Sequence, residues 1–139
     1  MKKIIFAIAA STTVMFSLAG LFNGVLAREF LVNNVDQTLL RTPTNLMMVA
    51  AGYFVLSILM ALLYPKLVRA GGSPAMNGLL FGMGAGVCWL MPYSLVLFGV
   101  YKFPYIALPL DFAWALVEQG MGGLVIGLIY GKENNNTLS

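Results

Sequence analysis

The chain has 139 residues, of which 60% are hydrophobic and only 9% are charged, and its formal net charge is +3. A soluble globular domain usually carries about 25% charged residues, so this composition excludes an ordinary soluble protein. The chain has no histidine and a single cysteine, Cys88, which excludes an intrachain disulfide and removes the commonest ligand of haem and catalytic zinc. We therefore expect no cofactor and no metal site. The few basic residues stand beside apolar segments, which is a topology signal and not a nucleic-acid-binding patch.

Four apolar segments predict helices at residues 4–26, 46–64, 75–100 and 107–130. Each is long enough to cross ~30 Å of hydrocarbon at about 1.5 Å per residue. Only helices satisfy their own backbone in lipid on this pattern, because barrel strands would be shorter and would alternate. The sequence predicts an all-α integral membrane protein, in which residues 1–139 form one transmembrane domain, a four-helix bundle, followed by a polar tail at 133–139.

The first segment follows Met1-Lys2-Lys3 and also resembles a secretory signal peptide, with Val25-Leu26-Ala27 as a cleavage site. Its apolar run of about 23 residues is longer than the usual core of about 7–15 residues. This favours a first helix that is retained in the protein.

The ends of the second helix are marked by residue type. Asn45 is a good cap for its start, and Pro65 allows either an end near Tyr64 or a kinked continuation to residue 70. In the loop at 28–45, apolar residues recur at every fourth position, which is typical of a short amphipathic helix. Gly71-Gly72-Ser73-Pro74 predicts a turn, in which Ser73 caps the third helix.

Glycines at every fourth position lie on one face of a helix and let another backbone approach closely. The third and fourth helices both carry such rows, so we expect them to pack against each other. The helix-packing residues are Gly78, Gly82, Gly86, Gly123, Gly127 and Gly131. On the third helix, the same periodicity places Trp89 and Tyr93 on the glycine side, and Pro92 predicts a kink.

Lysines and arginines predict the orientation of the bundle. With the amino terminus inside, the inner side holds Lys2, Lys3, Lys66, Arg69 and Lys132. The outer side then holds Arg28, Arg41 and Lys102. This bias favours a multi-pass protein of the cell (inner or plasma) membrane with both termini in the cytoplasm.

The ends of the second and fourth helices look alike: Ala61-Leu62-Leu63-Tyr64-Pro65-Lys66 against Gly127-Leu128-Ile129-Tyr130-Gly131-Lys132. The same alignment pairs Asn45 with Asp111. One interpretation is two helical hairpins arranged as a parallel repeat, as some transporters use. The other is that apolar segments of unrelated origin resemble each other.

Glu118 is the sharpest chemical feature, because it lies inside the fourth apolar segment. A charge at the centre of a membrane helix costs roughly 2.5–3.5 kcal/mol on insertion scales, so such residues face a bundle interior or a cavity. Glu118 either binds a proton or cation, or it is a neutral hydrogen-bonded acid that fixes helix packing. Helical spacing places it opposite the glycine face of its own helix. Asp111 is expected to cap this helix at the membrane interface, with ligand binding as its other role.

Several polar residues fall at the same depth, in the outer half of the predicted membrane domain. The candidate proton- or ligand-binding residues are Glu118, Gln119, Tyr93, Asp111 and Asn23, and Tyr53 and Ser94 lie at this depth as well. They would suit a shallow polar pocket open to the outside, although Tyr and Asn are also enriched at membrane interfaces.

Two classes of function remain open. The first is a small transporter or channel subunit, with Glu118 as its carboxylate and Tyr93 and Gln119 as hydrogen-bond partners. We expect it to be oligomeric, because four short helices enclose little volume. The second is a structural or accessory subunit of a larger membrane complex, which docks through its glycine faces. An enzyme is not expected, because the sequence has no HExxH motif, no nucleophile paired with a base and no glycine-rich phosphate loop.

Overall fold

The computed structural model describes residues 2–36, 38, 40–69 and 71–131, and every regular element in this part of the chain is helical. The elements are α1 (Lys2–Leu21), the π-helical turn η1 (Phe22–Leu26), α2 (Arg28–Asn34), α3 (Leu46–Leu67), α4 (Pro74–Ala85), the π-helical turn η3 (Gly86–Leu90), α5 (Met91–Val100) and α6 (Ala107–Gly131). They form four spans long and apolar enough to cross a membrane: Lys2–Leu26, Leu46–Leu67, Pro74–Val100 and Ala107–Gly131. The prediction of four such helices is confirmed. The predicted tail at 133–139, Lys132 and residue 70 lie outside the described residues.

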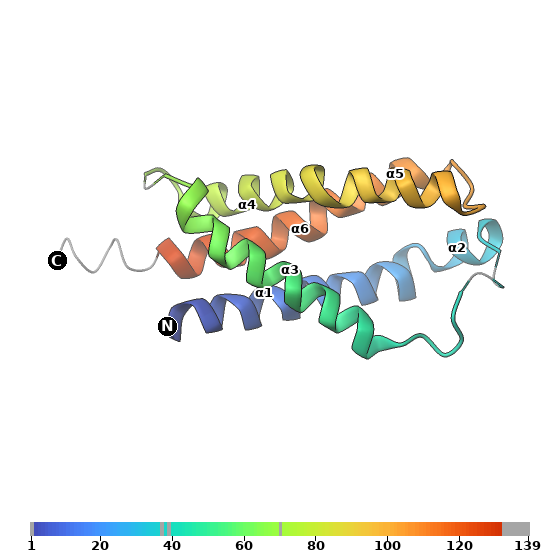
Figure 1. The fold of residues 1–139 in the computed structure, drawn as a ribbon, viewed down its shortest axis with the longest axis horizontal. Coiled ribbons are helices and arrows are strands. Elements are labelled where there is room, and N and C mark those ends of the chain that lie inside the picture. The colour runs from blue at the N-terminus through green and yellow to red at the C-terminus, as the bar shows by residue number, and fades with distance from the viewer. Residues whose placement is uncertain (1, 37, 39, 70, 132–139) are drawn as a thin grey trace.

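Helix α6 occupies the middle of the bundle (Figure 1), with its largest contacts to α4 and then to α1. Helix α3 packs mainly on α1 and crosses in front of α6 in this view. The Lys3 ammonium donates to the carbonyl oxygen of Tyr130 at 2.9 Å, so the start of α1 and the end of α6 lie together. We call this side of the molecule the Lys3 end, and the opposite side, which carries α2, the α2 end.

Local chemistry explains the helix boundaries. The side chain of Asn45 accepts a hydrogen bond from the Met48 N–H at 3.1 Å, which confirms the predicted cap of α3. Ser73 caps α4 through a longer contact of 3.5 Å to Met76, with Pro74 as the first helical residue. Gly71 and Gly72 have φ of 140° and 70°, backbone angles that side chains disfavour, and this fixes the predicted turn.

Helix α3 continues through Pro65 and ends at Leu67, between the two ends predicted for the second helix, Tyr64 and residue 70. Proline lacks an N–H, so it normally leaves the carbonyl four residues earlier without a donor. Here that carbonyl, at Ala61, accepts a hydrogen bond from the Tyr130 hydroxyl of α6. The tertiary contact therefore replaces the missing helical bond.

The seam between α4 and α6 is built from glycine backbones. A Cβ atom added to Gly127 would lie 2.7 Å from Cα of Gly78, and one added to Gly82 would lie 2.9 Å from the carbonyl carbon of Gln119. Real Cβ atoms essentially never approach so closely, so neither position has room for a side chain. Gly123 meets Gly78 and Gly82 in the same way, whereas Gly131 faces the Pro74 ring.

Trp89 and Tyr93 do not share the glycine side, which corrects the sequence-based expectation. Both side chains are exposed, at 64% and 56%. The reason is η3, in which the Met91 N–H bonds to the Gly86 carbonyl five residues back. A π turn holds more residues than an α turn, so the 3.6-residue periodicity of α4 does not carry across it. This turn ends at Leu90, two residues before Pro92, the residue from which a kink was expected.

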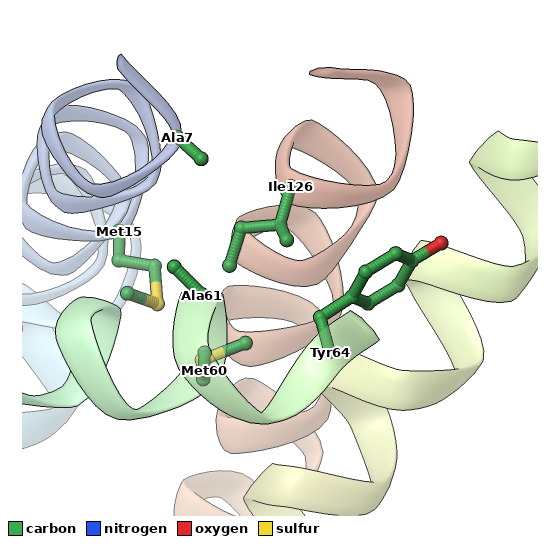
Figure 2. Packing of buried hydrophobic residues seen from close by; sticks show 6 residues of the cluster. All are labelled: Ala7, Met15, Met60, Ala61, Tyr64 and Ile126. Atoms are coloured by element: carbon green, nitrogen blue, oxygen red, sulfur yellow. The ribbon is translucent and has the colours of Figure 1, made fainter. Parts of the chain in front are cut away.

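The buried apolar core lies between α1, α3 and α6 (Figure 2). It consists of Ala7, Met15, Met60, Ala61, Tyr64 and Ile126. The outside of the bundle, in contrast, exposes large apolar side chains such as Phe6 at 64% and Met47 at 82%. An apolar exterior of this kind fits a hydrocarbon environment.

Candidate functional site

The carboxyl group of Glu118 is buried on the side of α6 that faces away from the glycine seam. Only 3% of the residue is exposed. One helical turn further on, the space above Gly122 is filled by the Met15 side chain of α1. Glu118 therefore faces the interior between α6, α1 and α3.

Three side chains hydrogen-bond to Glu118. The Trp114 Nε1–H donates to Oε2 at 3.2 Å, and Nε2 of Gln119 donates to Oε1 at 2.9 Å. The Tyr53 hydroxyl of α3 is the third partner. We call Tyr53, Trp114, Glu118 and Gln119 the Glu118 cluster. Among the described residues no lysine or arginine contacts it, so the carboxyl group is held by neutral groups alone.

Aromatic rings fix the cluster in place. Trp114 precedes Glu118 by one helical turn, which brings its indole N–H over the carboxyl group. Its ring stacks on Phe22 of η1, with centroids 4.5 Å apart and planes 12° apart. The Tyr53 ring makes an edge contact with Phe16 of α1 at 6.3 Å. The positions of Trp114 and Tyr53 are therefore set by α1 and η1 as well as by their own helices.

The prediction that Asp111 caps the fourth helix is wrong. Helix α6 begins at Ala107, so Asp111 lies inside it, and its carboxylate accepts a hydrogen bond from the Ser94 hydroxyl of α5. The helix starts earlier because Pro109 falls in its first turn, where a missing N–H costs nothing. Asp111 precedes Glu118 by seven residues, about 10 Å along the axis. The two acids share one face of α6, with Asp111 nearer the α2 end.

Two other candidates are not part of the cluster. Tyr93, the predicted hydrogen-bond partner of Glu118, points outward and is exposed. Asn23 is exposed on η1, and its amide donates to the Ala19 carbonyl of its own helix at 2.9 Å. Tyr53 takes the role expected for Tyr93. The spacing of Tyr53 from Ser57 and Tyr64, which share the buried side of α3, is the sequence signal that could have identified it.

Three buried polar atoms near the cluster have no hydrogen-bond partner in the described part of the chain: Oε1 of Gln119, Oγ of Ser57 and Oγ1 of Thr12. Gln119 and Ser57 are almost completely buried, at 1% and 0% exposed. Buried polar atoms are usually paired in proteins, so such exceptions call for an explanation.

The shallow polar pocket, one of two interpretations of the polar residues, stays a prediction, and the structure divides its candidates between buried residues such as Glu118 and exposed ones such as Tyr93. The two best-defined hollows in the described part of the molecule have volumes of about 430 and 460 Å³. The first is an apolar groove between α3 and Trp89, and the second lies in the loop at residues 41–45. Neither is lined by the Glu118 cluster. Glu118 and Gln119 are 3% and 1% exposed, so the centre of the cluster is enclosed.

Comparisons of the chain with protein-family models, with curated proteins and with solved structures found no match.

Proposed function

We propose that this chain is a small membrane transporter or channel subunit, in which Glu118 is the carboxylate that binds and releases a proton. The observation that carries the proposal is a carboxyl group that is 3% exposed, lies within an apolar span and has no cationic partner among the described residues. Such a group is costly in a membrane and is typical of ion and proton pathways.

A proton is the ligand that fits this enclosure. The carboxyl oxygens already contact Trp114, Gln119 and Tyr53, and neither hollow reaches them. A larger cation would have to displace these side chains, whereas a proton adds to a carboxyl oxygen without doing so. Tyr53 can then accept the new O–H, because a phenol oxygen is an acceptor as well as a donor.

The proposed setting is the cell membrane, with the Lys3 end in the cytoplasm and the α2 end outside. The lysine and arginine distribution supports this orientation.

A repeat of two helical hairpins, α1–α3 and α4–α6, is part of the proposal. It is supported by the meeting of Tyr64 and Tyr130, the residues that the repeat aligns, whose ring centroids lie 5.5 Å apart. Self-association would enlarge the small interior of a single chain.

The proposal is tested by infrared difference spectroscopy of the purified protein between about pH 6 and about pH 10, a range in which ordinary carboxyl groups stay ionised. A protonated carboxyl band should disappear in Glu118→Gln and persist in the control Glu29→Gln, which changes an exposed acid of α2. In proteoliposomes, Glu118→Gln should abolish proton movement driven by an imposed pH gradient. If the spectrum and the proton flux are the same in both variants, Glu118 is a packing group, and the chain is better described as an accessory subunit.

A further inference from the structure

Buried polar groups form a row that runs inward from the α2 end. Asp111 and Ser94 come first, and the Glu118 cluster follows two turns further along α6. The contact between Phe16 and Tyr53 sets the register of the antiparallel helices α1 and α3. One turn beyond it, toward the Lys3 end, stand Thr12 on α1 and Ser57 on α3.

The inner part of this row has free hydrogen-bonding capacity. The hydroxyl oxygens of Ser57 and Thr12 and the amide oxygen of Gln119 are buried and lack partners in the described part of the chain. Ordered water molecules satisfy groups of this kind in proteins. Hydroxyl groups can also both accept and donate a proton, so they can pass one on. The only titratable groups described in contact or electrostatic interaction with Glu118 are Tyr53 on α3 and Asp111 on α6.

The row stops at the apolar core. Beyond Ser57 the space between α1, α3 and α6 is filled by Met60 and Ile126, and Met15 fills the space beside Ser57, over Gly122. All three residues are at most 2% exposed (Figure 2). Ser11 lies at this level too, but its hydroxyl already donates to the Ile8 carbonyl at 3.3 Å. On the far side, the Tyr130 hydroxyl is bonded to Ala61. We infer that protons reach Glu118 only from the α2 end, along this row, and that Met15, Met60 and Ile126 form a plug that closes the way to the Lys3 end.

Two of the three plug residues are suited to movement. Methionine is unbranched and flexible, and it adapts to gaps of irregular shape. Met15 rests on Gly122, where an added Cβ atom would lie 2.7 Å from its Cγ. The glycine thus provides the room that the Met15 side chain occupies one turn from Glu118. Rotation of the methionine side chains would connect the row with the Lys3 end and leave the helices in place.

The inference rests on the proposed function, and proton flux into proteoliposomes with an internal pH-sensitive dye tests it separately. Met60→Ala should raise proton flux severalfold over wild type, because it removes most of one plug side chain. The control is Met47→Ala on the same helix, since Met47 is 82% exposed and should leave the flux unchanged. The double variant Met60→Ala/Glu118→Gln should conduct no more than Glu118→Gln alone, because the row then lacks its proton-binding group.

Met15→Ala is a second variant that removes a plug side chain, and it replaces Met60→Ala if that protein does not fold. Circular dichroism and gel filtration show whether each variant is folded. A folded plug variant without increased flux would overturn the inference. So would an increased flux that persists after Glu118→Gln, because it would reflect a general packing defect. Either result can occur while Glu118 still titrates in the infrared spectrum, so failure of the plug is distinguishable from failure of the proposed function.

Discussion

The hydroxyl of Tyr130 donates a 3.0 Å hydrogen bond to the carbonyl oxygen of Ala61. This is the oxygen that Pro65 leaves without its helical donor, because residue 65 has no N–H to offer. In hydrocarbon there is no water to take the place of that donor. The bond therefore joins α6 to α3 at the Lys3 end and allows α3 to continue past its proline.

Tyr130→Phe should lower the free energy of unfolding by about 1–3 kcal/mol, the usual cost of leaving a buried acceptor unsatisfied. The phenyl ring would keep its place beside Tyr64, so lost packing contributes little. Reversible unfolding in mixed micelles, followed by circular dichroism, measures the change.

A double-mutant cycle with Pro65→Ala tests this cause, because alanine supplies an N–H for the Ala61 carbonyl. In this background Tyr130→Phe should cost much less than in the wild-type chain. An equal cost in both backgrounds would show that the Tyr130 hydroxyl acts independently of the proline.

Helices α4 and α6 should not tolerate side chains along their seam. Gly82→Ala places a methyl group within 2.9 Å of the Gln119 backbone, which cannot move aside as a flexible side chain could. Overpacking of this kind typically costs about 1–3 kcal/mol, and more where backbones must separate. Thermal unfolding in detergent should show a clear decrease in the midpoint.

Gly84 provides a matched control for this prediction. It lies on α4 two residues from Gly82, and an added Cβ atom there meets nothing within 4 Å. Gly84→Ala should be neutral or slightly stabilising, since alanine favours the helix by up to about 1 kcal/mol over glycine. Equal loss of stability in both variants would contradict the assignment of the seam.

The parts of this structure that follow from simple periodicity were predictable from the sequence. Apolar length identified the four spans, and glycines four residues apart identified the faces that meet in the α4–α6 seam. Residue type identified the cap at Asn45. The position of Glu118 opposite the glycine face followed from the 100° rotation per residue, because α6 is a regular helix throughout.

The partners of Glu118 could not be predicted from helical periodicity, because they depend on tertiary contacts between helices. Tyr93 was preferred over Tyr53, but η3 changes the register of the third span before residue 93 is reached. Asp111 has the residue type of a cap, yet the helix begins four residues earlier. Tyr53 comes from another span altogether, and only the packing of α3 on α1 brings it to the cluster.

The Asn45 cap at the start of α3 gives a further prediction about stability. Asn45→Ala removes the side-chain acceptor of the Met48 N–H and should cost about 0.5–2 kcal/mol of unfolding free energy. Asn45→Asp keeps an acceptor at the same position and should retain most of the stability. Chemical unfolding of the three proteins measures both effects, and equal loss in the two variants would exclude capping as the cause.

Trp114→Phe should show how much its indole N–H contributes to the Glu118 cluster. The variant keeps an aromatic ring that can stack on Phe22, and it loses the donor to Oε2 of Glu118 together with the second ring of the indole. We expect a loss of about 1.5–3 kcal/mol, the range for a hydrogen bond to a charged group. Trp89→Phe is the matched control, because Trp89 is 64% exposed and should stay within about ±0.5 kcal/mol of wild type.

The origin of that loss can be assigned with Glu118→Gln. If the indole acts through the carboxylate, Trp114→Phe should cost less in the Glu118→Gln background, because the remaining acceptor is then a neutral amide. The coupling energy is obtained from the unfolding free energies of the four proteins in the cycle. A coupling of zero would mean that Trp114 stabilises the bundle through its ring alone, and the hydrogen bond would then have no part in holding Glu118 in place.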